Sequence, residues 1–167
     1  MVMNIKFLII TLFFLNSCGF TPIYYNFDSD SKDYNYHEKL TLVKIKKYRS
    51  DIDYKLHDHL TKILNPYNNI EDKKYILDIK LTDQISSTFT TSTGSSGRNK
   101  ITLNANYQLI DIKSGDILGS GRASESGDFD VGNKRFANYT TQEETKLYLT
   151  KLIATDIRNM IINDLYQ

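Results

Sequence analysis

Hydrophobic and polar residues alternate along two segments of the chain, residues 73–89 and 100–111. A period of two puts successive side chains on opposite faces, which is typical of β-strands that bury one face. Residues 91–99 lie between these segments and are rich in Ser, Thr and Gly, so they predict a hairpin tip that ends in Arg98 and Asn99. The side chains expected to face inward are Tyr75, Leu77, Ile79, Leu81, Ile85 and Phe89 from the first strand, and Ile101, Leu103, Ala105, Tyr107 and Leu109 from the second.

Two further strands are expected on either side of this hairpin. Residues 38–48 have a β-rich composition and end in a basic cluster, so they predict a strand. Residues 111–131 open with a Ser114–Gly115 turn and continue as a fourth strand. Because Gly119 and Gly121 have no side chains to pack, we expect another backbone to approach this strand closely.

Two segments have the spacing of amphipathic helices instead. The first follows Ser50 as N-cap, places apolar residues at helical spacing and ends before Pro66. The second is expected to begin with a capping box formed by Thr140 with Glu143, or by Thr141 with Glu144. Its apolar stripe consists of Leu149, Ile153, Ile157, Met160, Ile161 and Leu165.

The resulting order is β-α-β-β-β-α, within a single domain of residues 38–167. Both helices have one apolar side and the two best strands have one apolar face. We therefore expect an α+β fold, a two-layer sandwich in which both helices pack on one face of a four-stranded sheet. The other sheet face is rich in Thr, Asn, Gln and Lys, and should meet water or a polar partner.

The first 37 residues have a different pattern. Lys6 precedes a short apolar stretch, residues 7–15, which predicts a signal peptide of residues 1–17 because the stretch is too short to span a membrane. The sequence Leu15-Asn16-Ser17-Cys18 then resembles the bacterial lipobox. A buried free cysteine in a transmembrane anchor is the alternative reading. We expect Cys18 to be lipidated and residues 18–37 to be a tether.

Charge and cysteine content limit the partners. Removing residues 1–17 takes away Lys6 and no acidic residue, so the 21 basic side chains become 20, equal in number to the 20 acidic ones. No net field would attract nucleic acid. Cys18 is the sole cysteine, so the mature chain has no disulfide and depends on packing for stability.

Candidate catalytic and metal-binding patterns are weak. His57 and His59 lie two apart in a predicted helix, so their imidazoles point away from each other and cannot share a metal. Asp128 and Asp130 are expected to be solvated carboxylates at a strand end. The chain has no G-x-S-x-G elbow, and its Gly-rich segment 119–127 lacks the Lys of a phosphate-binding loop. We expect no enzyme activity, no metal and no cofactor.

Three features together resemble the LptE family, the outer-membrane lipoproteins of lipopolysaccharide assembly. They are the sequence Cys18-Gly19-Phe20-x-Pro22-x-Tyr24, the hairpin that carries Arg98 and runs into residues 103–121, and residues 135–145 before a long final helix. The order and spacing of these motifs, more than any one of them, carry the resemblance. It spans essentially the whole mature chain.

The resemblance implies a lipoprotein held on the periplasmic face of the outer membrane and inserted into the lumen of the β-barrel LptD as plug and assembly aid. It also implies contact with lipopolysaccharide through Arg98, with Lys100 beside it, and through Lys134 or Arg135. Two alternatives remain open: a periplasm-facing lipid-transport accessory or binding lipoprotein without a barrel partner, and a cell-envelope hydrolase, which would need a titratable pair in a deep pocket.

Overall fold

The computed structural model describes residues 38–48, 50–70, 72–90 and 96–166, all of which belong to one compact unit, Asp33–Gln167. The predicted signal peptide and tether, with Cys18, lie outside the described residues.

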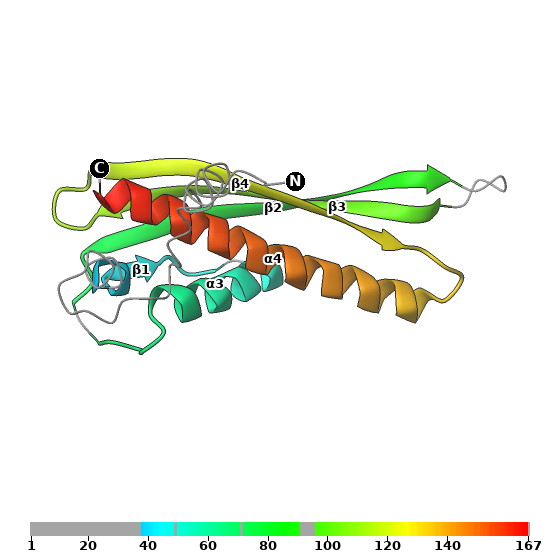
Figure 1. Ribbon diagram of the computed structural model, residues 1–167, viewed down its shortest axis with the longest axis horizontal. Helices are drawn as coiled ribbons and strands as arrows, with labels where there is room; N and C mark the ends of the chain where they lie inside the picture. Colours follow the sequence, from blue (N-terminus) through cyan, green and yellow to red (C-terminus); the bar gives the residue numbers. More distant parts are fainter. Residues whose placement is uncertain (1–37, 49, 71, 91–95, 167) are drawn as a thin grey trace, which may run out of the picture. The chain divides into compact units, whose positions relative to one another are not determined.

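The described chain forms β1 (Val43–Ile45), α3 (Asp51–Leu64), β2 (Tyr75–Thr90), β3 (Ser96–Asp111), β4 (Ile117–Asp130) and α4 (Arg135–Tyr166). The sheet has the order β1-β2-β3-β4, in which β1 runs parallel to β2 and the other neighbours are antiparallel. Both helices lie on the same side of the sheet, as Figure 1 shows. The predicted two-layer α+β sandwich is confirmed.

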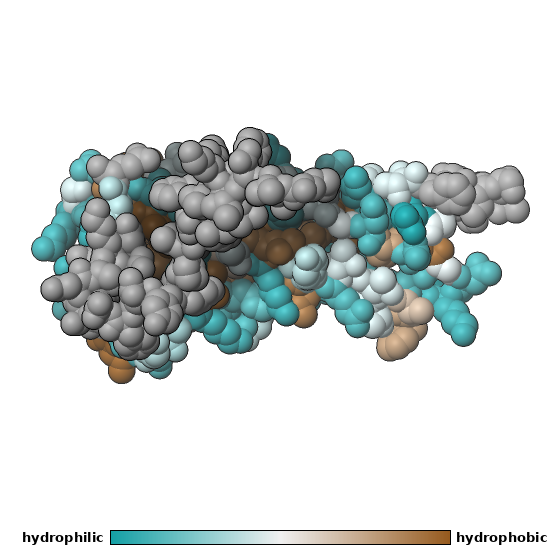
Figure 2. Space-filling view, in the orientation of Figure 1, coloured by the Kyte–Doolittle hydropathy of each residue, from teal (hydrophilic) through white to brown (hydrophobic). Residues whose placement is uncertain are grey.

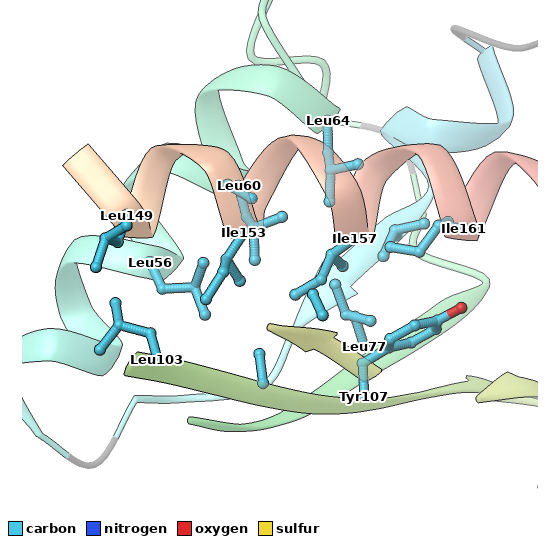
Figure 3. Packing of buried hydrophobic residues seen from close by; sticks show 14 of the residues in the cluster. Leu56, Leu60, Leu64, Leu77, Leu103, Tyr107, Leu149, Ile153, Ile157 and Ile161 are labelled. Atoms are coloured by element: carbon cyan, nitrogen blue, oxygen red, sulfur yellow. The ribbon is translucent and has the colours of Figure 1, made fainter. Parts of the chain in front are cut away.

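The alternation of residues in β2 and β3 decides which side chains enter the core. Leu77 pairs with Leu109 across these strands, and both are fully buried under α4. Figure 3 shows the sheet residues Leu77, Leu103 and Tyr107 below Ile153 and Ile157 of α4, with Leu60 of α3 at the same interface. The five predicted inward residues of β3 are all buried. In β2 burial decreases along the strand, and Ile85 is 43% exposed. The side chain of Phe89 is outside the described part.

The opposite face of the sheet is polar from Asp78 to the far end of the strands, whereas its row next to the β3–β4 turn pairs Ile76 with Ile110 and Ile110 with Ile117. The strand register aligns Lys80 with Asn106 and Arg122, and the next row contains Thr82, Asn104 and Ser124. These side chains are exposed or half-buried. Neither α3 nor α4 covers this face, which we call the open sheet face (Figure 1).

Helix α3 begins as its sequence predicts. The Ser50 hydroxyl accepts a hydrogen bond from the Asp53 N–H at 3.2 Å, and the Asp53 carboxylate accepts one from the Ser50 N–H at 3.1 Å. This reciprocal pair is a capping box, which satisfies two backbone donors at the helix start.

The strand predicted over residues 38–48 is much shorter in the structure. Residues 38–41 form a helical turn, in which the Thr41 hydroxyl donates to the Glu38 carbonyl at 2.7 Å, and β1 has only three residues. Contacts with residues distant in the sequence determine the conformation here, in place of the local preference for a strand. Lys39 donates to the Leu165 carbonyl at 3.0 Å, and Lys73 donates to the Thr41 carbonyl at 2.6 Å.

Helix α4 also begins earlier than predicted, at Arg135. The Asn138 N–H already bonds to the Lys134 carbonyl, so the helix has formed before the two predicted capping boxes. The hydroxyls of Thr140 and Thr141 donate to the carbonyls four residues before them instead of capping the helix. The capping-box prediction for this helix is therefore wrong.

The glycines of β4 face α4 and accommodate side chains, where a close backbone was expected. A Cβ on Gly119 would overlap the Asp164 carboxylate, and one on Gly121 would lie 2.8 Å from the Tyr107 ring. The missing side chains leave room for a hydrogen bond of 2.7 Å from the Tyr107 hydroxyl to Asp164 Oδ2. Burial and this bond raise the pKa of Tyr107, so its hydroxyl stays protonated.

Candidate functional site

The four basic residues predicted to contact lipopolysaccharide lie at one end of the sandwich. This distal end consists of residues 86–90, 96–100 and 126–135, where the β2–β3 hairpin, the end of β4 and the start of α4 lie (Figure 1). The Val131 N–H donates to the Gly97 carbonyl at 3.1 Å and ties the end of β4 to β3. The Asn138 side chain exchanges two hydrogen bonds with the Gly132 backbone, which fixes the connection into α4.

Arg98 lies within β3, not in the hairpin tip where the sequence placed it. It pairs in register with Asp130 of β4, and its Nε atom lies 2.9 Å from Asp130 Oδ1. Both side chains are more than half exposed. The hydrogen bond that Arg98 donates to the Asp130 carboxylate raises the pKa of the guanidinium. An anionic ligand at Arg98 must therefore compete with a carboxylate that is already in place.

Lys100 lies two residues further along β3, on the same open sheet face as Arg98. Its register partner on β4 is Asp128. The two predicted cations of β3 thus stand opposite two carboxylates, and alternation along the strands places all four groups on one face. The structure brings Arg98 and Lys100 together but gives each an acidic neighbour.

Lys134 and Arg135 belong to a different element, the connection into α4 and its first residue. Both side chains are exposed, and neither forms a salt bridge with another residue of the described ranges. The distal end as a whole carries the four predicted cations and two carboxylates, Asp128 and Asp130. The arrangement can attract a phosphate electrostatically, and Arg135 can in addition bind it with two parallel hydrogen bonds.

The open sheet face carries a second set of polar groups. The sequence predicted that this face is polar but did not single out these residues. A shallow hollow on this face is lined by Asp78, Lys80, Asn106, Gln108 and Ser120, among others. Next to it, the amide oxygen of Asn104 accepts hydrogen bonds from Arg122 and from Ser124. The alternation of Asn and Gln with apolar residues in residues 100–111 is the signal that places these amides on one surface.

His57 and His59 belong to no group of three or more potential metal ligands within the described part of the chain. His57 packs its ring against Tyr48, with 5.6 Å between the centroids. Burial lowers the pKa of His59, which favours its neutral form. Asp130, one of the two carboxylates considered as a catalytic pair, is engaged with Arg98.

None of the helices in the described segments is both long enough and apolar enough to cross a membrane. The 32-residue helix α4 exposes Lys151, Thr155 and Asn159 in its C-terminal half, and Phe136, Tyr139 and Tyr148 in its N-terminal half.

Comparison with known proteins identifies the fold. No protein-family model matches the sequence, and no match is found among curated proteins. A candidate lipoprotein of Caulobacter crescentus is similar in structure, with a TM-score of 0.65 and 17% identity over 79% of this chain and 96% of that one. Rare lipoprotein B of Shewanella oneidensis has a TM-score of 0.52 and 10% identity over 75% and 97%. An uncharacterized lipoprotein B of Nitrosomonas europaea has a TM-score of 0.53 and 12% identity over 71% and 79%. The chain therefore shares its fold with bacterial lipoproteins.

Proposed function

We propose that this protein is a non-enzymatic outer-membrane lipoprotein of the LptE type. In this proposal Cys18 carries the lipid, the domain sits on the periplasmic face, and its partner is an LptD-type β-barrel through which lipopolysaccharide reaches the outer leaflet. The lipobox-like sequence before Cys18 and the fold shared with bacterial lipoproteins support this function.

The open sheet face is the observation that carries the barrel partnership. It presents Lys, Thr, Asn, Gln, Ser and Arg side chains over three strands, while the apolar face of the same sheet is sealed by α3 and α4. Large membrane barrels have polar, water-filled interiors. A domain whose open sheet face is polar from Asp78 onward can enter such a lumen with this face in contact with water and with its core still covered by α3 and α4.

Lipopolysaccharide contact would take place at the distal end. Lys134 and Arg135 are exposed cations that form no salt bridge with another described residue. Phosphate groups favour guanidinium and ammonium donors. Arg98 and Lys100 would join them once a phosphate competes with Asp130 and Asp128. The strongest contribution should therefore come from the start of α4.

The lipid anchor is tested by Cys18→Ala. Without the thiol no diacylglycerol can be attached, so the variant should accumulate as a precursor that keeps residues 1–17. Mass spectrometry of the N-terminal peptide distinguishes precursor from mature protein. Normal maturation of the variant would refute the anchor.

The partnership is tested by affinity purification of the tagged protein from its own membrane. We expect a large heat-modifiable barrel to co-purify. Asn106→Trp places a bulky side chain on the open sheet face and should reduce the amount of barrel recovered, whereas Lys151→Trp on the exposed side of α4 should not. Recovery of a monomer from detergent would favour instead the lipid-transport accessory without a barrel.

The distal cations are tested by reversing charge at Arg98 and Lys134 together. The double Glu variant should bind purified lipopolysaccharide more weakly, with an unchanged circular dichroism spectrum because both side chains are exposed. The matched control reverses Lys44 and Lys113, two exposed cations outside the distal end. Unchanged binding by the distal variant would remove this site.

A further inference from the structure

The end of the sandwich opposite the distal end is where the chain enters the described domain. Residues 38–42, residues 65–74, the β3–β4 turn (residues 111–118) and the last turn of α4 meet here, and we call this region the entry end. The Lys74 N–H donates to the Leu42 carbonyl at 3.0 Å, and the Ile112 N–H donates to the Lys74 carbonyl at 2.9 Å. Lys39 donates to the carbonyl of Leu165. Backbone and side-chain bonds thus hold these segments together.

Large apolar side chains are exposed at this end on two neighbouring segments. Ile70 is 97% exposed and Ile117 is 56% exposed, although both are aliphatic residues that soluble proteins normally cover. Figure 2 shows hydrophobic surface protruding over the loop between α3 and β2. The complete set of exposed apolar side chains at the entry end is Tyr67, Ile70, Ile112, Ile117 and Leu118.

The loop between α3 and β2 presents its apolar residues from an ordered turn. Asn65 closes it, because its side chain donates to the Asn69 carbonyl at 3.0 Å and accepts from the Asn69 N–H at 2.9 Å. Ile70 follows this closed turn directly. Its exposure is therefore set by the fold of the loop.

The β3–β4 turn is fixed in a similar way. The Asp111 carboxylate accepts from the N–H groups of Lys113 and Ser114 at 2.7 and 3.0 Å, which lowers the pKa of Asp111. Gly115 supplies the positive φ of 79° that the turn requires. Ile112 and Ile117 thus project from a rigid turn, as preorganised contact residues do.

The position of the chain entry indicates what covers this surface. Nineteen residues separate Cys18 from Glu38, and Glu38 lies at the entry end. The distal end lies a further 16 residues of β2 away, roughly 50 Å at the rise of an extended strand. Counted along the chain, the lipid on Cys18 therefore lies nearer to the end of the domain that exposes these apolar side chains than to the distal end.

We propose that the entry end docks on the bilayer that carries the lipid anchor, with Ile70 and Ile117 inserted among the lipid headgroups and upper acyl chains. This inference rests on the proposed lipidation of Cys18 and adds a second membrane contact made by the folded domain. Apolar side chains that insert beside the lipid on Cys18 add buried apolar area to the attachment. Exposed Lys74 and Lys113 can keep their ammonium groups in the headgroup layer while their stems lie along the apolar surface.

Docking of this end also gives the domain an orientation. With the entry end at the periplasmic surface of the membrane, the strands lead the distal cations away from that surface and into the lumen of the proposed barrel. The membrane contact at the entry end and the lipopolysaccharide contact at the distal end are then separated by the length of β2. A mutation at one contact can therefore leave the other unchanged.

The absence of tryptophan from the sequence allows a direct test. Single-Trp variants Ile70→Trp and Ile117→Trp place a fluorophore at the entry end, and Phe136→Trp places one at the distal end, where Phe136 is 82% exposed. All three positions are exposed, so each variant should fold. The mature lipoprotein would be purified from membranes and reconstituted into phosphatidylethanolamine–phosphatidylglycerol vesicles, with or without brominated acyl chains.

We expect brominated lipid to reduce the emission of the Ile70 and Ile117 variants to about half or less, with a blue shift, because both probes lie at acyl-chain depth. Emission of the Phe136 variant should not change. Reconstituted protein with no quenching at the entry end would overturn the docking while leaving the anchor intact, as would quenching of the Phe136 probe alone. Failure of all variants to enter vesicles would overturn the anchor and the docking together.

Discussion

The half of the sandwich next to the entry end (the entry half) and the half next to the distal end (the distal half) are held together by different interactions. The same three strands, β2, β3 and β4, and the same helix, α4, run through both halves. In the entry half, Leu77 and Leu109 pack against Ile157 and Ile161 with almost no exposed surface. In the distal half, β2 meets α4 through an ion pair of 2.8 Å between Asp83 and Lys146, while Ile101 of β3 and Phe129 of β4 remain buried.

The difference follows from what covers β2. Strand β1 pairs only with residues 75–77 of β2, so the outer edge of β2 beyond Leu77 has no strand neighbour among the described residues. Burial falls along β2 from Leu77 to Ile85, and α4 changes in parallel from Ile and Leu to Thr, Glu and Lys. Apolar packing thus ends earlier along β2 than along β3 and β4, and polar contacts with α4 take its place on β2.

The largest effect should come from a core residue of the entry half. Ile157→Ala removes a fully buried side chain between sheet and helix and leaves a cavity. We expect the free energy of unfolding to fall by about 2–5 kcal/mol, measured by urea denaturation. Ile85→Ala in the distal half is the control and should cost less than about 1 kcal/mol, because that side chain is 43% exposed. Similar losses for the two variants would contradict the proposed difference between the halves.

A smaller effect is expected where α4 approaches β4. In Gly119→Ala the new Cβ would overlap the Asp164 side chain and force its carboxylate away from the Tyr107 hydroxyl. The stability loss should be about 1–3 kcal/mol. Gly132→Ala is a matched control, since the nearest atom to its Cβ would be 4.0 Å away. If both variants unfolded at the same urea concentration, close packing at Gly119 would not matter.

The sequence predicted the elements whose local pattern agrees with their tertiary surroundings. Alternation in residues 101–109 matches the burial of β3, and Ser50 caps α3 as expected, because each signal is satisfied by neighbours in the chain or in the adjacent strand. The start of α4 was misjudged because Thr140 and Thr141 fit a capping pattern but bond back along an existing helix.

The candidate site was predictable only in part. The sequence supplied Arg98 and Lys100 as cations, but the strand register that sets them opposite Asp130 and Asp128 depends on the pairing of β3 with β4. That pairing joins residues about 30 apart in the chain, and no local pattern encodes it. The closed turns that expose Ile70 and Ile117 are likewise products of Asn65 and Asp111 side-chain hydrogen bonds with nearby backbone groups.

A third experiment isolates the hydrogen bond that joins the entry halves of β3 and α4. Tyr107→Phe removes a buried hydroxyl and leaves Asp164 without this donor, which should cost about 1 kcal/mol. It should also change the pH dependence. The folded-state pKa of Tyr107 is raised above its ordinary value of 10.0, so its contribution to stability is full below pH 10 and is lost as pH rises further. Urea denaturation at alkaline pH should show a shallower decline for the variant than for the wild type.

The smallest effect should come from the ion pair of the distal half. The Lys146 side chain is only 16% exposed. Lys146→Met keeps most of its apolar stem but leaves Asp83 without its partner. Because Asp83 remains partly solvated, we expect a loss of about 0.5–1 kcal/mol at low salt. Salt screens the wild-type pair, so the difference between the two proteins should shrink in concentrated NaCl. Ile157→Ala should show no such narrowing, since its deficit is a cavity. A Lys146→Met deficit that stays constant with salt would mean that the distal half is held by packing of the lysine stem, and the contrast between the two halves would then be one of degree.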